Sequence, residues 1–158
     1  MRAWKGNNWN MKTRKASFKD IDKLVRIEMN SGYKWGMKKE KFASHLKRIL
    51  NLKYSRCFIL ESKRAIGYFL VNIERKSCYL NYFAIIKSRH GKGYSKIMIG
   101  KAISFAKKHD CKKIELGVWA KNFPAIGLYN KYGFYIFEIK RKHYSNRDDK
   151  LRMRKELK

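Results

Sequence analysis

Proline is nearly absent from this sequence, which has one at position 124, and cysteine is scarce. The three cysteines, Cys57, Cys78 and Cys111, are odd in number and widely spaced, which excludes a disulfide framework or a cysteine-based zinc site. No apolar run reaches the ~18 residues of a membrane helix, and residues 1–10 lack the apolar core of an export signal. We therefore expect a cytoplasmic protein with reduced thiols, no metal and no membrane attachment.

Negative charge is also scarce, because 12 acidic residues face 40 lysines and arginines, giving a net charge of +28. Most basic side chains must therefore lie unpaired on the surface. Such a surface attracts anions, including nucleotide cofactors, and allows docking to nucleic acid or the ribosome, whereas it repels polyamines. A lysine-rich genome that uses Lys at any solvated position would produce the same composition, so the charge alone does not define a partner.

Hydrophobic residues make up 44% of this chain of 158 residues, and they recur at regular spacings. We expect residues 11–158 to form a single domain and residues 1–10 to be an extension. Helical spacing and two-residue alternation identify the elements. The predicted helices lie within residues 18–30, 38–50, 94–109 and 122–134, and the predicted strands within 13–18, 56–61, 65–75, 78–86, 112–120, 134–140 and 150–157.

The order of these elements predicts an α/β fold, with a mixed, mostly antiparallel sheet flanked by about four helices. Short links join the three strands between residues 56 and 86, as in an antiparallel meander. The third of these strands is apolar on both faces. Strict alternation places Phe83 and Ile85 on one face, and Leu80 and Tyr82 on the other. We therefore expect a central strand covered on both sides.

Two glycines, Gly91 and Gly93, separate that strand from the next helix. A strand that passes through Gly-x-Gly into a helix presents backbone N–H groups to an anion, and the helix N-terminus adds partial positive charge. Neither the dinucleotide fingerprint nor the P-loop fits, because Lys96 and Ile86 stand where those motifs require glycine. Taken alone, the turn is either a phosphate site or an ordinary strand-to-helix connection.

With a second motif downstream, this turn resembles the GCN5-related N-acetyltransferase (GNAT) superfamily. The family signature Arg/Gln-x-x-Gly-x-Gly/Ala corresponds to the window from His90 to Ser95, although both end residues depart from the pattern. The family pattern Asn-x-x-Ala-x-x-x-Tyr-x-x-x-Gly-Phe is matched by Asn122, Ala125, Tyr129, Gly133 and Phe134. The two motifs occur in the family's order, and the resemblance covers roughly residues 11–157.

The resemblance implies that acetyl-CoA donates its acetyl group to a primary amine by direct attack. A backbone amide near Phe83 to Ile85 would meet the charge that develops on the thioester oxygen. Tyr129 would act as the general acid for the leaving thiolate, unless it is only a packing residue. The residues implied to bind acetyl-CoA are Phe83, Ala84, Ile85, Arg89, His90, Gly91, Lys92, Gly93, Tyr94, Ser95, Asn122 and Tyr129.

The general base cannot be carried over from the family. Ribosomal-protein acetyltransferases have a glutamate five residues before the asparagine, but that position is Gly117 here. Glu115 lies two residues earlier on the same strand face and is the candidate base. Glu28, His143 or a chain of water molecules are the alternatives.

The acceptor side resembles the protein N-terminal acetyltransferases of this family. Glu28, Tyr33 and Trp35 fall in the loop region between the first two helices, and Tyr144 falls in the final hairpin, so these four residues are expected to bind substrate. A protein or peptide amine is therefore expected as acceptor, either an α-amine or a lysine, with a small amine such as a polyamine as the alternative. A basic nucleic-acid-binding domain without catalysis is the competing class. The chain is expected to be a monomer or a homodimer.

Overall fold

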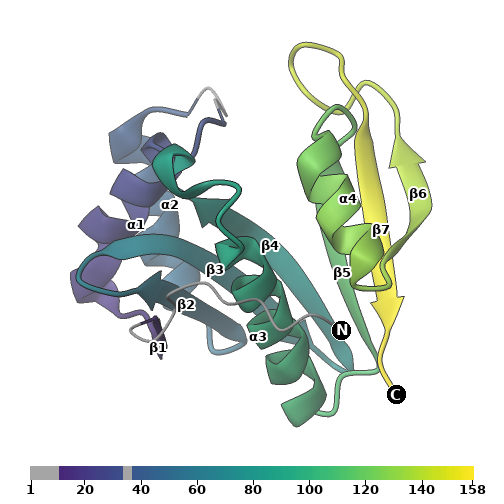
Figure 1. Cartoon of the computed structure of the whole chain (residues 1–158), viewed down its shortest axis with the longest axis horizontal. Helices are drawn as coiled ribbons and strands as arrows, with labels where there is room; N and C mark the ends of the chain where they lie inside the picture. Colours follow the sequence, from purple (N-terminus) through teal and green to yellow (C-terminus); the bar gives the residue numbers. More distant parts are fainter. Residues whose placement is uncertain (1–10, 34–36) are drawn as a thin grey trace.

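The computed structural model describes residues 11–33 and 37–158, and its elements follow the predicted order (Figure 1). The strands are β1 (Lys12–Lys15), β2 (Ser55–Glu61), β3 (Ala65–Glu74), β4 (Ser77–Ile85), β5 (Lys113–Trp119), β6 (Tyr135–Lys140) and β7 (Lys150–Glu156). The helices are α1 (Ile21–Met29), α2 (Lys39–Leu50), α3 (Tyr94–Lys108) and α4 (Phe123–Lys131). None of the helices in the described ranges is long and apolar enough to cross a membrane.

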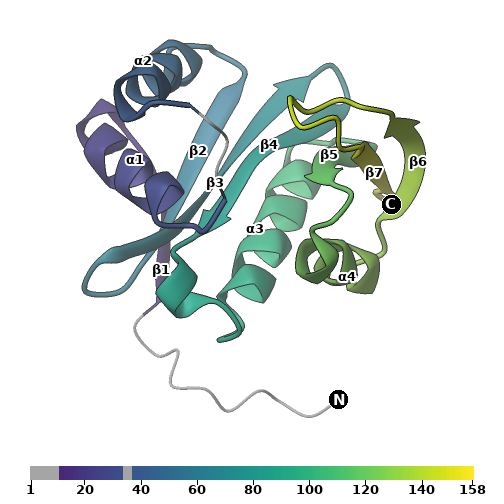
Figure 2. The same ribbon diagram turned by 90° about the horizontal axis from the view of Figure 1, so that it is seen from above.

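The seven strands of the described ranges form one sheet in the order β1-β2-β3-β4-β5-β7-β6. Neighbouring strands are antiparallel, except that β4 and β5 are parallel and are joined through α3. Helices α1 and α2 cover one face of the sheet, and α3 and α4 cover the other (Figure 2). The expected α/β fold with a mixed, mostly antiparallel sheet is confirmed.

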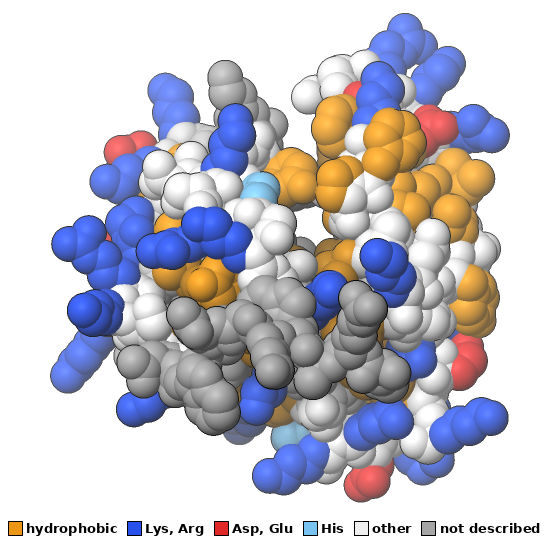
Figure 3. Space-filling model, in the orientation of Figure 1, with side chains coloured by type: hydrophobic (Ala, Val, Ile, Leu, Met, Phe, Trp, Pro, Cys, Tyr) orange, Lys and Arg blue, Asp and Glu red, His pale blue; other side chains and the backbone are white. Residues whose placement is uncertain are grey.

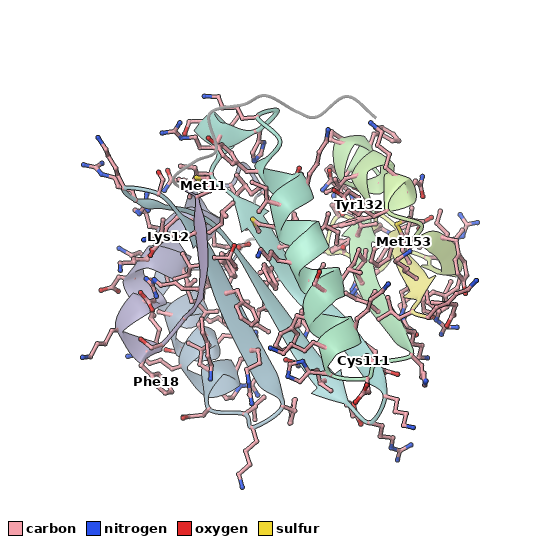
Figure 4. All side chains as sticks on the ribbon, turned by 60° about the horizontal axis from the view of Figure 1, so that its bottom comes forward. Met11, Lys12, Phe18, Cys111, Tyr132 and Met153 are labelled. Carbon is pink, nitrogen blue, oxygen red and sulfur yellow. The ribbon has the colours of Figure 1, made fainter. Side chains whose placement is uncertain are left out.

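The sheet separates two hydrophobic clusters. On one side, α3 buries Met98, Ile99 and Ala102 against the strands. On the other side, α1 and α2 bury residues such as Leu24 and Leu46. All three cysteines are free and buried, as the sequence led us to expect, and Cys111 lies just beyond the end of α3 (Figure 4). Helices therefore pack on both faces of the sheet.

A β-bulge in β4 changes which residues share a face. Leu70 pairs with Tyr82 and Val71 pairs with Leu80, so Asn81 is the extra residue and lies exposed. Leu80 consequently joins the cluster under α3 together with Ile85, while Tyr82 packs on the opposite side. The prediction that Leu80 and Tyr82 share a face is wrong, because one inserted residue reverses the alternation.

The bulge also marks the point where β4 and β5 separate. Their parallel pairing runs from Ser77 opposite Lys113 to Leu80 opposite Leu116, and no described pair follows. Beyond this point the two strands diverge toward the top of Figure 1. The sheet is therefore open at its centre, between the half that carries α1 and α2 and the half that carries β6 and β7.

Candidate active site

The gap between β4 and β5 opens into a cleft of about 940 Å³. Figure 3 shows the molecule hollowed between its two halves at this place. Side chains of α1, α2, β4, β5, α4, β7 and the β6–β7 hairpin all reach it. Of the residues that the sequence singled out, those that line it are Glu28, Tyr33, Phe83, Ala84, Glu115, Asn122, Tyr129, His143 and Tyr144.

The glycine turn lies at the N-terminus of α3, at the end of β4. Gly91 and Gly93 have φ angles of +70° and +79°, in the left-handed region that favours glycine. No atom lies within 4 Å of where a Cβ at position 91 would stand, so the turn is open toward solvent. The first N–H groups of α3 have no partner within the helix. The turn therefore suits an anion such as the pyrophosphate of a nucleotide cofactor.

His90 replaces the Arg or Gln of the family signature, and the structure gives it a defined contact. Its Nε2 donates a hydrogen bond to the carbonyl of Ile85 over 2.8 Å, which ties the turn back to the end of β4. Arg89 and Tyr94 instead line a second hollow of about 470 Å³, beside Lys63 and Arg64. Positive charge thus gathers next to the turn.

Lys92 is exposed in the turn and Ser95 is half-buried in the first turn of α3. Across from them, the Tyr132 hydroxyl donates to the carbonyl of Lys96 over 3.3 Å. Figure 4 shows Tyr132 on the side of α4 that faces α3. The two helices are therefore joined at the edge of the turn.

Tyr129 reaches the cleft from α4. The Asn122 side chain caps this helix by accepting a hydrogen bond from the N–H of Ala125 over 3.3 Å. The Tyr129 ring contacts Phe83 edge to face, with centroids 6.1 Å apart, and also packs on Phe134. Burial raises the pKa of Tyr129 above its ordinary value, so its hydroxyl stays protonated and can donate a hydrogen bond.

The opposite wall holds a buried carboxylate. Glu28 is 4% exposed, and the Tyr68 hydroxyl donates to its Oε2 over 2.6 Å. Nearby, the hydroxyl of Tyr82 and Nε2 of His45 lie 2.7 Å apart. The contacts of Tyr68, Tyr82 and His45 could not be identified from the sequence, because their partners lie far away in the chain and no local motif links them.

Glu115, the candidate base, is also buried in the cleft wall, but it is surrounded by cations. Lys113, Arg152 and Arg154 approach its carboxylate at 3.0, 3.1 and 2.7 Å. Burial raises its pKa, but the contacts of Lys113 and Arg154 outweigh burial and hold the pKa of Glu115 below its ordinary value. A carboxylate held in this way is a weak proton acceptor, so the geometry does not favour Glu115 as the base.

The remaining acceptor-side residues divide between the two halves of the molecule. Tyr33 follows α1, and its N–H donates to the Ser31 hydroxyl over 3.3 Å. Tyr144 and His143 lie in the hairpin between β6 and β7, with ring centroids 5.0 Å apart. Trp35 lies outside the described residues. The cleft therefore receives aromatic side chains from both of its walls.

Known proteins share this architecture. A protein of Bacillus subtilis (strain 168), provisionally named a ribosomal protein bS18 alanine N-acetyltransferase, is 28% identical over 149 residues, covering 90% of this chain and 96% of its own. The crystal structure of the ribosomal-protein-S18-alanine N-acetyltransferase from Escherichia coli superposes with a TM-score of 0.81 at 20% identity, covering 93% of this chain and 94% of that one.

A spermidine N-acetyltransferase, a chimera of the Vibrio cholerae and hSSAT proteins, reaches the same TM-score of 0.81 at 19% identity, covering 93% of this chain and 95% of its own. Such structural likeness supports the fold and does not distinguish the acceptors. The sequence profile of the Acetyltransferase (GNAT) family, in turn, matches residues 21–134. The chain therefore belongs to the GNAT family and is an acetyl-CoA-dependent N-acetyltransferase.

Proposed function

We propose that this enzyme acetylates the α-amine of a protein or peptide in the cleft between β4 and β5. The observation that carries this proposal is the opening of the sheet itself. The parallel pairing stops at Leu80 and Leu116, and the resulting space is lined by Tyr129 and by aromatic side chains of both walls. A thioester and an amine can meet there from opposite sides of the sheet.

Acetyl-CoA, the cosubstrate of this family, supplies the activated acetyl group. The turn at Gly91 and Gly93 fits its pyrophosphate, because the turn is open around Gly91 and the α3 N-terminus adds partial positive charge. Arg89, Lys92, Tyr94 and Ser95 border this turn, and His90 fixes its position against β4. We propose that the anionic part of the cosubstrate binds here.

Two groups of this chain can stabilise the charges of the reaction. Beyond Leu80, the edge of β4 that faces the gap makes no ladder bonds with β5, so a backbone N–H near Phe83, Ala84 and Ile85 can meet the thioester oxygen. The protonated Tyr129 hydroxyl can donate to the leaving sulfur, and the rings of Phe83 and Phe134 hold it in place.

Charge favours a peptide over a polyamine, because the whole chain carries a net charge of +28 and repels a small polycation. An α-amine, with a pKa of ~7.7–8.0, is neutral at pH 7 far more often than a lysine amine with a pKa of ~10.4. Glu28, Tyr33 and Tyr144 are proposed to hold the peptide around that amine, as the named activity of the B. subtilis relative also suggests.

Acetyl-CoA turnover measured with three kinds of acceptor tests this function. The panel holds unblocked N-terminal peptides, a lysine peptide with a blocked N-terminus, and spermidine. We expect kcat/KM to be highest with unblocked peptides, and acetyl-CoA at micromolar concentration to raise the Tm. Faster turnover of spermidine would overturn the proposed acceptor. Absence of both turnover and a Tm shift, combined with salt-sensitive RNA binding, would favour the binding-domain alternative.

A further inference from the structure

Position 117 is a gap in the cleft wall of β5, and a lysine of β7 fills it. Gly117 has no side chain, and its neighbour across the strands is Arg152, while Lys150 is paired with Trp119. Lys150 leans along the sheet, so that a Cβ at position 117 would overlap its Cε and lie 3.0 Å from its Nζ. The lysine amine therefore occupies the space that a side chain at position 117 would take, inside the cleft.

Nothing in the described structure neutralises this amine. None of the ion pairs within residues 11–33 and 37–158 includes Lys150. Glu115, two residues along β5 from Gly117, is already held by three other cations. Lys150 is opposite Lys140 on β6, and Arg152 follows it on the same strand. Burial first, and then these two positive neighbours, lower the pKa of Lys150.

The other titratable groups around Lys150 do not reverse this effect. In the hairpin, burial together with Lys150 and Lys140 lowers the pKa of His143, which favours its neutral form and supplies no counter-charge to Lys150. Tyr144 beside it is neutral, because burial raises its pKa. Glu28 and His45 line the opposite wall of the cleft, where Tyr68 and Tyr82 contact them. A neutral amine at Lys150 is thus favoured over the ammonium relative to a lysine in water.

We propose that Lys150 takes the proton from the acceptor ammonium, a catalytic role that rests on the acetyl transfer proposed above. Its Nζ lone pair forms a new N–H bond, directly or through one water molecule, as the N–H bond of the acceptor ammonium breaks. The freed lone pair of the acceptor then attacks the thioester carbon. Lys150 returns its proton to solvent through the open cleft. The base is thus a lysine of β7 that occupies the space beside Gly117.

Lys150→Arg tests whether proton transfer, and not positive charge, is what Lys150 contributes. A guanidinium keeps the positive charge but cannot lose its proton at neutral pH. We expect both Lys150→Arg and Lys150→Met to lower kcat by ~10²-fold, the usual contribution of a general base. Each variant must keep the Tm shift caused by acetyl-CoA, which shows that it folds and binds. Lys108→Met, an exposed change on α3, should leave kcat unchanged. If Lys150→Arg keeps more than half of the kcat, the proton-acceptor role is wrong.

A double substitution at positions 117 and 150 tests whether another base can restore the kcat that is lost without Lys150. In Gly117→Glu/Lys150→Ala the shortened residue 150 leaves room for the new side chain, and part of the lost kcat should return. The acidic limb of kcat against pH should then move to lower pH than in the wild type, because Glu titrates near ~4.3 and Lys near ~10.4. Lys140→Met should move the wild-type limb to higher pH, since it removes a neighbouring positive charge.

The failure of this role can be told apart from the failure of the proposed function. A wild-type enzyme that acetylates none of the peptides would overturn the proposed acceptor and this role with it. Normal wild-type turnover with an acidic limb that is unmoved in both Lys140→Met and Gly117→Glu/Lys150→Ala would overturn the role of Lys150 alone. Intact mass after incubation with acetyl-CoA alone should show Lys150 unmodified, because an acetylated amine cannot accept a proton.

Discussion

Tyr129 is the residue whose proposed role is the most direct to test. Tyr129→Phe removes one hydroxyl and keeps the ring that packs on Phe83 and Phe134. We expect kcat to fall by ~10²-fold, because the leaving sulfur loses its hydrogen-bond donor, while the Kd for acetyl-CoA changes by less than about 2-fold. Steady-state kinetics and calorimetry measure the two effects.

The control for this change is Tyr135→Phe, which removes a hydroxyl from the exposed strand β6 and should leave kcat unchanged. Equal losses in turnover and in acetyl-CoA affinity for Tyr129→Phe would show that Tyr129 only shapes the binding site.

Glu115 is expected to contribute to stability more than to chemistry. Glu115→Gln leaves Arg154, Arg152 and Lys113 without their shared anion. Losing one partner of a fully buried pair costs ~3–5 kcal/mol, but these cations are partly exposed, so we expect a loss of ~2 kcal/mol. Urea unfolding measures it, with the exposed Glu156→Gln as a control that changes stability by less than ~0.5 kcal/mol.

The pH dependence of unfolding also tests whether Glu115 contributes to stability or acts as the base. Because the folded pKa of Glu115 lies below its ordinary value of 4.5, its contribution is present above that value and is lost as the pH falls through the folded pKa. Glu115→Gln should flatten this acid-side decline. If Glu115→Gln leaves the stability unchanged but removes the acidic limb of kcat against pH, Glu115 is the base after all.

At the scale of the element, two glycine substitutions test whether the turn before α3 binds the cosubstrate. Gly91→Ala forces a side chain into φ = +70°, which costs ~1–2 kcal/mol, although the space around it is open. We expect this strain to lower stability and to shift the N–H groups of the turn, so the Kd for acetyl-CoA rises. Gly100→Ala in the middle of α3 also meets open space, and there it should add ~0.5–1 kcal/mol.

Both glycine variants are measured by urea unfolding and by the Tm shift with acetyl-CoA. A weaker shift in Gly91→Ala alone supports the turn as the phosphate site. An unchanged acetyl-CoA affinity in Gly91→Ala would show that the turn only connects β4 to α3.

The element order was predictable because it depends on periodicity, which a sequence displays directly. Helical spacing identified α3, and two-residue alternation identified β5. The bulge at Asn81 was not predictable, since inserting one polar residue into a strand looks like ordinary alternation. The opening between β4 and β5, which makes the site, begins at that bulge.

Contacts between distant segments were equally invisible in the sequence. Tyr68 is 40 residues from Glu28, and only the folded sheet brings its hydroxyl to that carboxylate. From the sequence, glycine at position 117 led to Glu115 as the candidate base, because nothing in the sequence indicates that Lys150 reaches position 117 once β7 has paired with β5. The sequence allows a prediction for the cosubstrate side because a contiguous motif encodes it, whereas strands and loops from the whole chain build the acceptor side.

At the scale of the whole molecule, Lys and Arg side chains spread over the face seen in Figure 3, with few acidic groups among them. We propose that this field docks the enzyme on anionic surfaces such as ribosomal RNA. Binding to an RNA duplex should weaken linearly with the logarithm of salt concentration and show no sequence preference, because counterion release drives it. Fluorescence anisotropy between ~50 and ~200 mM salt should show a loss of ~10³-fold or more, as for about six phosphate contacts.

The kcat/KM for a short neutral peptide should change much less over the same salt range. Such a peptide binds in the cleft and does not depend on the long-range attraction of the surface charges, which salt screens. A ribosome-bound acceptor should, in contrast, lose kcat/KM in parallel with RNA affinity. If the ribosome-bound and free acceptors respond equally to salt, the charge of +28 plays no part in delivering the enzyme to its substrate, and lysine-rich composition alone accounts for it.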